Sequence, residues 1–165
     1  MRPMRLFKRE IKDEEILREI LEECDVVRLG GFDEDGMFIV PVNYGYELEN
    51  IGGKMHLRLY IHGAKEGRKA EAFAKNASVA VEMDCCHEVI IGDYTCSYSY
   101  AYRSIMGNGR IHVLTEKEKQ IHALTKIMEH LAPDAEIRFR PEMLERTAVF
   151  CIDVEDFTGK ERKKK

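Results

Sequence analysis

Residues 55–62 alternate between apolar and polar side chains, and this period of two constrains the fold more than any other feature of the chain. The apolar row is Met55, Leu57, Leu59 and Ile61, and the polar row is His56, Arg58, Tyr60 and His62. Successive side chains of a β-strand point to opposite faces, so each row occupies one face. We therefore expect the apolar row to fill a β-barrel and the polar row, which ends at His62, to lie outside it.

Further strands are predicted on both sides of this one. Apolar runs bounded by turn residues predict strands at 25–32, 37–46, 78–85, 100–114 and 148–157, with turns at 33–36 and 49–53. Gly107 and Gly109 lie inside the long strand, where glycine marks a bulge or a close backbone approach. Strands joined mostly by short turns favour an antiparallel barrel over a doubly wound sheet. The predicted fold class is therefore mainly β, a β-barrel with flanking helices.

Three helices are predicted at the margins of the sheet. Asp13 is the N-cap candidate of the first, whose apolar stripe is Ile16, Leu17, Ile20, Leu21 and Cys24. A short second helix is predicted at 65–76. Thr115 and Glu118 have the spacing of a capping box and predict the start of the third. The inward face of that third helix is predicted to be Ile121, Leu124, Met128 and Leu131.

Length and charge limit the class of protein. A chain of 165 residues suffices for one domain with its own core, which we place at 1–160, with the basic run 161–165 as a disordered tail. The net charge of −4 argues against nucleic-acid binding, because such proteins are usually basic. No apolar run is long enough to cross a bilayer, and residues 1–11 lack the core of a signal peptide. We expect a cytoplasmic protein that binds neither nucleic acid nor membranes.

The five cysteines are Cys24, Cys85, Cys86, Cys96 and Cys151, an odd number in a chain that needs no disulfide. This count predicts reduced thiols. Asp84 to His87, with Cys96 nearby, raises the alternative of a metal site. In an extended strand Cys86 would point away from Cys85 and His87, and the C-x2-C spacing of zinc sites is absent. Thiols near a core are favoured, and no metal is predicted.

The stretch LYIHGAKEGRKAEAF, residues 59–73, runs from a strand into a helix through two glycines and several cations. Backbone N–H groups at a helix start lack partners within the helix and attract anions. Gly63 and Gly67 permit close backbone approach, and Arg68 and Lys69 can donate charged hydrogen bonds to a phosphate. The spacing matches neither a Walker A loop nor the G-x-G-x-x-G fingerprint. A phosphate cradle and an ordinary strand-to-helix turn both remain open on these residues alone.

Four stretches occur in order and at compatible spacing: IVPVNYGYE at 39–47, LYIHGAKEGRK at 59–69, VEMDC at 81–85 and YRSIMGNGRI at 102–111. Together they resemble the pyridoxamine-5′-phosphate-oxidase-like flavoproteins, and among these the nitroimidazole-resistance branch. The resemblance covers residues 10–114 well and the closing VFCIDVEDFTGK more loosely. It implies an FMN-binding split β-barrel that forms a homodimer and holds FMN in a groove between the subunits.

The resemblance also implies which residues contact the flavin. Pro41 and Val42 would pack beside the ring, with Asn43 and Tyr44 supplying polar contacts at its edge. The phosphate loop would consist of His62, Gly63, Ala64, Lys65, Gly67, Arg68 and Lys69, and family members more often carry serine at the position of Gly63. Lys69, supported by Arg68, would neutralise the phosphate. Arg103, Ser104 and Ile105 on the long strand would reach the phosphate or the ring.

Structural alternatives to these assignments remain open. The segment 41–44 also fits an ordinary edge strand, and Arg103 also fits an ion pair with an acidic residue of the barrel surface. His62 is the predicted catalytic residue, a proton donor or substrate orienter beside the flavin, because imidazole titrates near neutral pH. Its alternative is a hydrogen-bonded loop histidine.

Three functions from different classes compete. The first is an FMN-dependent oxidoreductase that reduces a small organic substrate, nitroaromatic or quinone-like. The second is a non-catalytic flavin- or haem-type binding module on the same barrel, and the third is a cofactor-free interaction barrel. No nicotinamide-binding motif is present, so the electron donor is open, and the fold alone does not choose among the three. The first is the predicted function.

Overall fold

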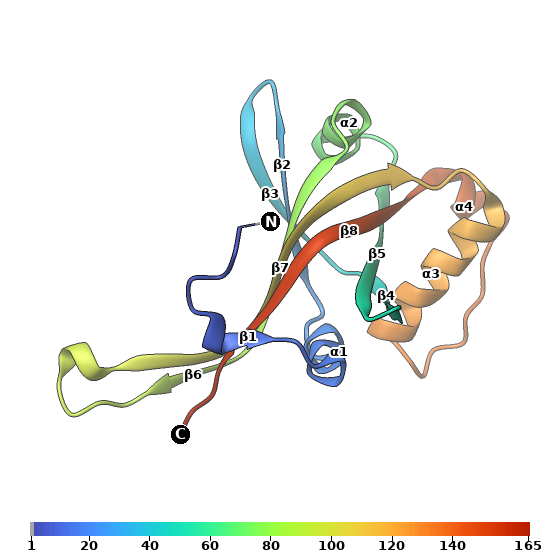
Figure 1. Ribbon diagram of the computed structural model, residues 1–165. Helices are drawn as coiled ribbons and strands as arrows, with labels where there is room; N and C mark the ends of the chain where they lie inside the picture. Colours follow the sequence, from blue (N-terminus) through green and yellow to red (C-terminus); the bar gives the residue numbers. More distant parts are fainter. Residues whose placement is uncertain (1) are drawn as a thin grey trace.

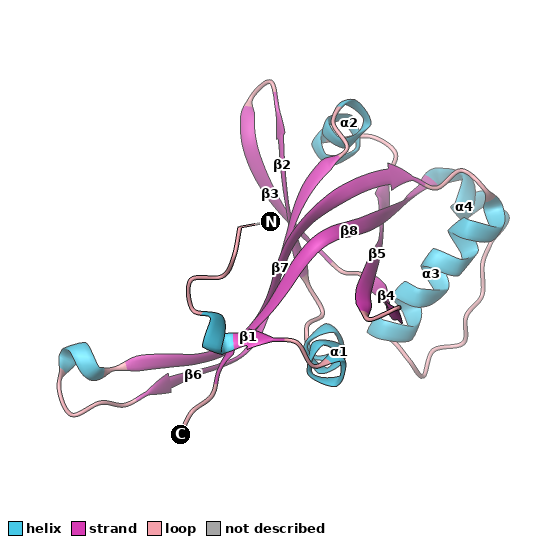
Figure 2. Ribbon diagram, viewed as in Figure 1, coloured by secondary structure: helices cyan, strands magenta, loops and turns pink. Residues whose placement is uncertain are grey.

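The computed structural model describes residues 2–165 and consists of one curved antiparallel sheet with helices at its margins (Figures 1 and 2). The strands are β1 (Glu10–Ile11), β2 (Val27–Asp33), β3 (Gly36–Val42), β4 (Gly45–Ile51), β5 (Lys54–Ala64), β6 (Ser78–Ile90), β7 (Ser99–Val113) and β8 (Thr147–Arg162). Their order in the sheet is β3-β2-β6-β7-β8-β5-β4, and β1 pairs with β8. The helices are α1 (Glu14–Glu23), α2 (Arg68–Lys75), α3 (Lys117–Leu131) and α4 (Pro141–Arg146). The predicted fold class, mainly β and antiparallel, is confirmed.

The main core lies between the inner face of the sheet and helices α1 and α2. Leu57, Leu59 and Ile61 of β5 are buried in it, as their alternation predicts. The side chain of Asp13 accepts a hydrogen bond from the Glu15 N–H at 2.8 Å and so caps α1, also as predicted. Local sequence patterns therefore identify both the strand face and the helix start correctly.

A second hydrophobic cluster lies on the outer face of the sheet, beneath α3, which Figure 1 shows beside β4 and β5. Its buried members are Tyr60, Leu114, Ala123, Ile127, Val149 and Cys151. The predicted inward face at Ile121, Leu124, Met128 and Leu131 is only partly confirmed: Leu124 packs against this cluster, but the buried residues of α3 are Ala123 and Ile127, and Leu131 is exposed. The reason is a close contact with β4: a side chain at Gly45 would lie 2.4 Å from the Ile127 backbone. This contact places the side of α3 that carries Ala123 and Ile127 against the sheet.

Two further local predictions are wrong. The capping box at Thr115 and Glu118 does not form, because the chain is still hydrogen-bonded to β8 at Leu114, whose N–H donates to the Val149 carbonyl, and the N-cap is Glu116. The single strand predicted at 37–46 is two strands, β3 and β4, which lie at opposite ends of the sheet order. Tyr44 fixes the crossover between them, since its hydroxyl contacts the carbonyls of Leu21 and Cys24 at 2.7 and 2.8 Å.

Four strands are longer than the sequence predicts, and one of them, β5, continues through Gly63 to Ala64. β4 and β6 continue to Ile51 and Ile90, and β6 contains a register shift between Cys85 and Glu88. β8 continues to Arg162 and so includes two residues of the predicted tail. The β7–β8 register shifts at Gly109, which confirms the predicted irregularity. No helix within residues 2–165 has both the length and the apolar character that crossing a membrane requires.

Candidate functional site

The site begins where β5 ends and α2 starts, a segment of residues 62–69 that we call the β5–α2 junction. Gly67 is the N-cap of α2, and no side chain caps the helix start. The Lys69 ammonium lies over Gly63, because a Cβ built on that glycine would lie 2.7 Å from Lys69 Nζ. It also lies 5.8 Å from the ring centroid of the buried Phe150. A side chain as small as serine at position 63 would therefore displace the Lys69 ammonium.

The electrostatics of this junction favour an anion. Lys69 is half-buried, and within residues 2–165 no carboxylate lies at ion-pair distance from its ammonium. Burial lowers the pKa of Lys69, and burial followed by the charge of Lys69 lowers the pKa of His62 below its usual 6.5. Burying a charged ammonium without a counter-charge costs free energy. A phosphate or carboxylate bound beside Lys69 would therefore stabilise its charged form.

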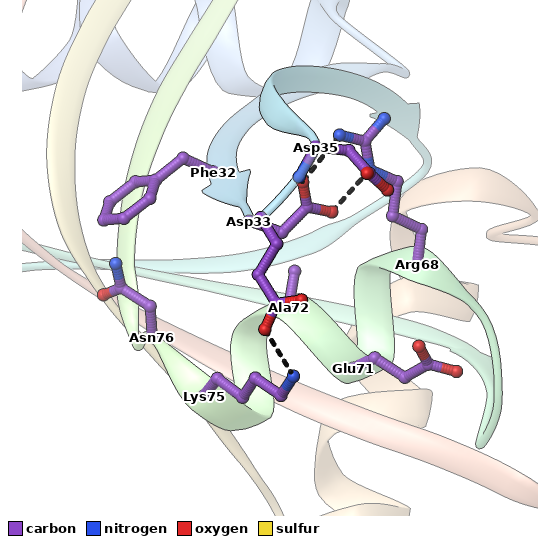
Figure 3. Close-up of a pocket in the computed structure, with 9 residues that line it drawn as sticks. Phe32, Asp33, Asp35, Arg68, Glu71, Ala72, Lys75 and Asn76 are labelled. Atoms are coloured by element: carbon purple, nitrogen blue, oxygen red, sulfur yellow. Dashed lines mark hydrogen bonds and ion pairs between the residues drawn. The ribbon is translucent and has the colours of Figure 1, made fainter.

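Arg68, the other cation predicted to grip the phosphate, is held by Asp33 at the β2–β3 turn. Its Nε and Nη2 donate to the two carboxylate oxygens of Asp33 at 2.6 and 2.8 Å, and its guanidinium lies 4.9 Å from the Phe38 ring centroid. This ion pair forms part of a cleft of about 580 Å³ between the β2–β3 turn and α2 (Figure 3). In this structure Arg68 is paired with Asp33, whereas the Lys69 ammonium lies over Gly63 at the junction.

The other loop residues predicted to bind phosphate, Ala64, Lys65 and Gly67, are all exposed around the junction. Ala64 is the last residue of β5, opposite Thr147 of β8, while Lys65 and Gly67 lie in the turn that connects β5 to α2. The structure thus brings together the predicted site residues that are close in the sequence, those of the β5–α2 junction.

The segment 41–44 divides into exposed and buried residues. Pro41 and Asn43 are exposed and Val42 is half-buried. The Asn43 amide nitrogen donates to the Asp25 carbonyl at 2.8 Å. Tyr44 is fully buried, and its hydroxyl is engaged by the carbonyls that fix the crossover. Tyr44 is therefore a core residue and Val42 packs against the core, while Pro41 and Asn43 remain accessible.

The predicted residues of β7 are also only partly accessible. Ile105 is fully buried in the main core. Arg103 donates to Glu161 at 3.2 Å and to Glu19 at 2.7 Å, so the ion-pair alternative describes it in this structure. The bond to Glu19 joins α1 to β7, and the bond to Glu161 joins β8 to β7. Ser104 is half-buried and lies opposite Asp84 of β6 and Lys160 of β8.

Within one chain the predicted flavin residues form two separate groups. His62 pairs with Val149 near the start of β8, whereas Arg103 pairs with Glu161 near its end. Pro41 lies on β3, four strands from β8 in the sheet order, and is opposite Arg28 of β2. Twelve residues of extended strand separate Val149 from Glu161, roughly 40 Å along β8. Figure 1 shows β8 running from α4 to the C-terminus.

The structure also shows an apolar groove that the sequence analysis did not identify. It has a volume of about 880 Å³ and lies over β2, β3, β6 and β7. Met37 and Ile39 line it with exposed fractions of 89% and 73%, while their neighbour Phe38 packs on the core. The signal was present in the sequence: β3 is apolar at successive positions, which is typical of strands covered on both faces.

All five cysteines are free thiols, as predicted. Cys85 and Cys86 have their sulfurs 3.6 Å apart at the β6 bulge, where Cys86 adopts a φ of 60°. His87 bonds to Asp84 at 2.9 Å, and Cys96 is exposed in the 3₁₀ turn before β7. Among the described residues 2–165, this cluster does not bring three metal-ligating atoms together.

Comparison with solved structures identifies similar folds. A candidate 5-nitroimidazole antibiotic resistance protein of Bacteroides thetaiotaomicron is 27% identical, with a TM-score of 0.78 over 92% of this chain and 86% of that one. A flavocytochrome of Azotobacter vinelandii is 19% identical, with a TM-score of 0.79 over 98% of this chain and 72% of that one. An FAD- and haem-binding protein of Mycobacterium smegmatis is 19% identical, with a TM-score of 0.79 over 94% and 74%. These likenesses confirm the predicted split-barrel fold.

Comparison with curated proteins finds no match. The sequence profile described as pyridoxamine 5′-phosphate oxidase matches residues 13–161, which is most of the chain. This match and the likeness to the Bacteroides protein confirm the resemblance found in the sequence. The chain therefore belongs to the pyridoxamine 5′-phosphate oxidase family.

Proposed function

We propose that this protein is an FMN-dependent oxidoreductase that reduces a small organic substrate, and that the FMN phosphate binds at the β5–α2 junction. The observation that carries the proposal is the half-buried Lys69 ammonium, which no carboxylate among residues 2–165 neutralises. Family membership supports a flavin as the ligand. FMN fits this chemistry, because its phosphate supplies the missing counter-charge and its ring requires an apolar groove.

Homodimerisation is part of the proposal. The two groups of predicted flavin residues lie near opposite ends of β8, so one chain does not bring both to one small ligand. In a two-fold dimer, the junction of one protomer meets the second group of its partner, and two equivalent sites result. The exposed apolar face at Met37 and Ile39 supports an interface, since soluble monomers rarely expose large contiguous apolar patches.

The β6–β7 hairpin supports the same proposal. Figure 1 shows it extending away from the rest of the molecule. Its exposed apolar and aromatic residues are Val89, Ile91, Tyr94, Tyr98 and Tyr100. A projecting hairpin of this composition buries little apolar surface against its own chain and suits a contact with a partner subunit.

The residues of the junction take distinct roles in this proposal. Bound FMN would supply the two-electron chemistry of its ring. Lys69 would hold the phosphate, and the exposed Pro41 and Asn43 of the partner subunit would line the ring. His62 would orient the substrate and donate a proton to it, because it is exposed on the outer face of β5 at the junction, near enough to the Lys69 ammonium over Gly63 for that charge to lower its pKa. A cytoplasmic location is part of the same proposal.

We expect the purified protein to be yellow and to release FMN on denaturation. The absorbance spectrum and the mass of the released ligand test this directly. Oxidation of a reduced nicotinamide with a nitroaromatic or quinone acceptor would then show turnover. A bound flavin without turnover would identify a non-catalytic binding module, and a colourless protein that does not bind added FMN would contradict the proposal.

We expect Ile39→Glu to convert the homodimer to a folded monomer with greatly weakened FMN binding. A buried charge without a partner costs several kcal/mol at an interface, whereas an exposed charge on a free β3 face costs little. Light scattering measures the mass, and circular dichroism checks the fold. Met143→Glu, at an exposed apolar position on α4, is the matched control and should remain dimeric. A wild-type monomer that binds FMN would overturn the interfacial site.

A further inference from the structure

Three metal-ligating side chains meet on the outer face of β7 and β8. His112 of β7 lies directly opposite Cys151 of β8, and Asp153 follows Cys151 by two residues. Directly opposed residues and residues at i, i+2 share a face, so the pairing register brings the three together. One imidazole nitrogen, one sulfur and one carboxylate oxygen all lie within 4.8 Å of one another.

The separations of these atoms are close to those of a metal centre. In a tetrahedral site with bonds of about 2.0–2.3 Å, neighbouring ligand atoms are about 3.3–3.7 Å apart. His112 Nδ1 and Asp153 Oδ2 are 3.7 Å apart, which is too long for a hydrogen bond but suits two ligands of one ion. The side chains of His112 and Asp153 are about half exposed, so both can rotate by the small amount required. Cys151 is 3% exposed and forms the floor of the cluster.

The surroundings leave room for further ligands. The cluster lines a cleft of about 440 Å³ between the sheet and α3, together with Tyr60 and His122. The other carboxylate oxygen of Asp153 accepts a hydrogen bond from Arg58 Nε at 3.1 Å. This bond holds the carboxylate so that Oδ2 faces His112, which is the orienting role that outer partners play around metal ligands.

We propose that His112, Cys151 and Asp153 bind a divalent transition-metal ion of the zinc class through nitrogen, sulfur and oxygen. A mixed set of imidazole, thiolate and carboxylate suits Zn²⁺ and Co²⁺ and disfavours Mg²⁺ and Ca²⁺, which prefer oxygen ligands. The thiolate and the carboxylate together balance the charge of the ion. The three protein ligands leave one position for water or a small molecule in the cleft. The proposal does not depend on FMN, since none of the three residues belongs to the β5–α2 junction.

Cobalt titration of the chelator-treated protein tests the site. We expect one Co²⁺ per chain and a thiolate-to-cobalt charge-transfer band in the difference spectrum, which added Zn²⁺ removes. Cys151→Ser should abolish the band. His112→Ala and Asp153→Ala should weaken Co²⁺ binding by at least the 10–100-fold typical of losing an outer-shell partner. Because these two positions are exposed, the variants should fold even if Cys151→Ser does not.

Two control variants exclude other ligands. The triple variant Cys85→Ser, Cys86→Ser, Cys96→Ser removes the accessible thiols, and His56→Ala removes an exposed histidine of β5. Both should bind Co²⁺ with the band and affinity of the unmodified protein. A wild-type protein without the band would overturn the proposal, as would a band that persists in Cys151→Ser or an affinity unchanged in His112→Ala.

Discussion

Lys69→Ala should raise the dissociation constant for FMN by one to two decades and leave that for riboflavin nearly unchanged. Only FMN carries the phosphate, and losing one charged hydrogen bond costs about 1.5–3 kcal/mol. The Lys69 ammonium is the one that the fold holds over Gly63 at the β5–α2 junction. Titration of the flavin-free protein with both ligands, followed by flavin fluorescence, measures the difference.

The neighbouring Arg68 is the control for this prediction. Arg68→Ala should change FMN affinity by no more than about 0.5 kcal/mol, because its Nε and Nη2 donate to the carboxylate of Asp33. Equal weakening of FMN and riboflavin by Lys69→Ala would show that the phosphate binds elsewhere.

His62→Gln should lower the rate of substrate reduction about a hundredfold and leave FMN affinity within about 1 kcal/mol. Glutamine keeps the ability to donate a hydrogen bond but loses the transferable proton, and general acid catalysis contributes at least about two decades. The loss of one neutral hydrogen bond limits the change in binding. Stopped-flow reoxidation of the reduced protein by substrate, together with FMN titration of the same variant, separates the two effects. Wild-type values of both would mark His62 as a structural loop residue.

The pH dependence gives an independent test of His62. Burial and the Lys69 charge lower its pKa below 6.5, so the imidazole is mainly neutral at pH 7 and gains its proton only in more acidic solution. The rate of reduction should therefore rise as the pH falls toward and through this pKa, and His62→Gln should lose that rise. A phosphate bound at Lys69 removes part of the repulsion, so the pKa of His62 should increase when FMN binds. Histidine NMR titration with and without FMN measures this shift.

The part of the candidate site at the β5–α2 junction was predictable from the sequence. His62, Gly63 and Lys69 lie within eight residues, so the end of one strand and the first turn of the next helix bring them together whatever the rest of the chain does. The apolar row of β5 and the Asp13 cap of α1 were predictable for the same reason. Side-chain periodicity and helix caps depend on neighbouring residues in the chain.

The partners of the cations required the tertiary structure. Arg68 and Lys69 are adjacent and chemically similar, yet Asp33, 35 residues from Arg68, binds one and leaves the other available. Arg103 is likewise held by Glu19 and Glu161 from distant parts of the chain. No local sequence pattern indicates which carboxylate of the chain lies close enough to form an ion pair with a given cation.

The sequence by itself determined that the chain forms an antiparallel barrel with a strand-to-helix junction suited to an anion. Only the tertiary structure decided the crossover at Tyr44, the face that α3 buries, and the meeting of His112 with Cys151 and Asp153. Period-two patterns show which face of a strand is buried, because burial acts on each residue separately. The register between strands and the rotation of a helix about its axis depend on how many side chains from distant parts of the chain pack together. These packing contacts exist only in the folded chain, so no local pattern determines them.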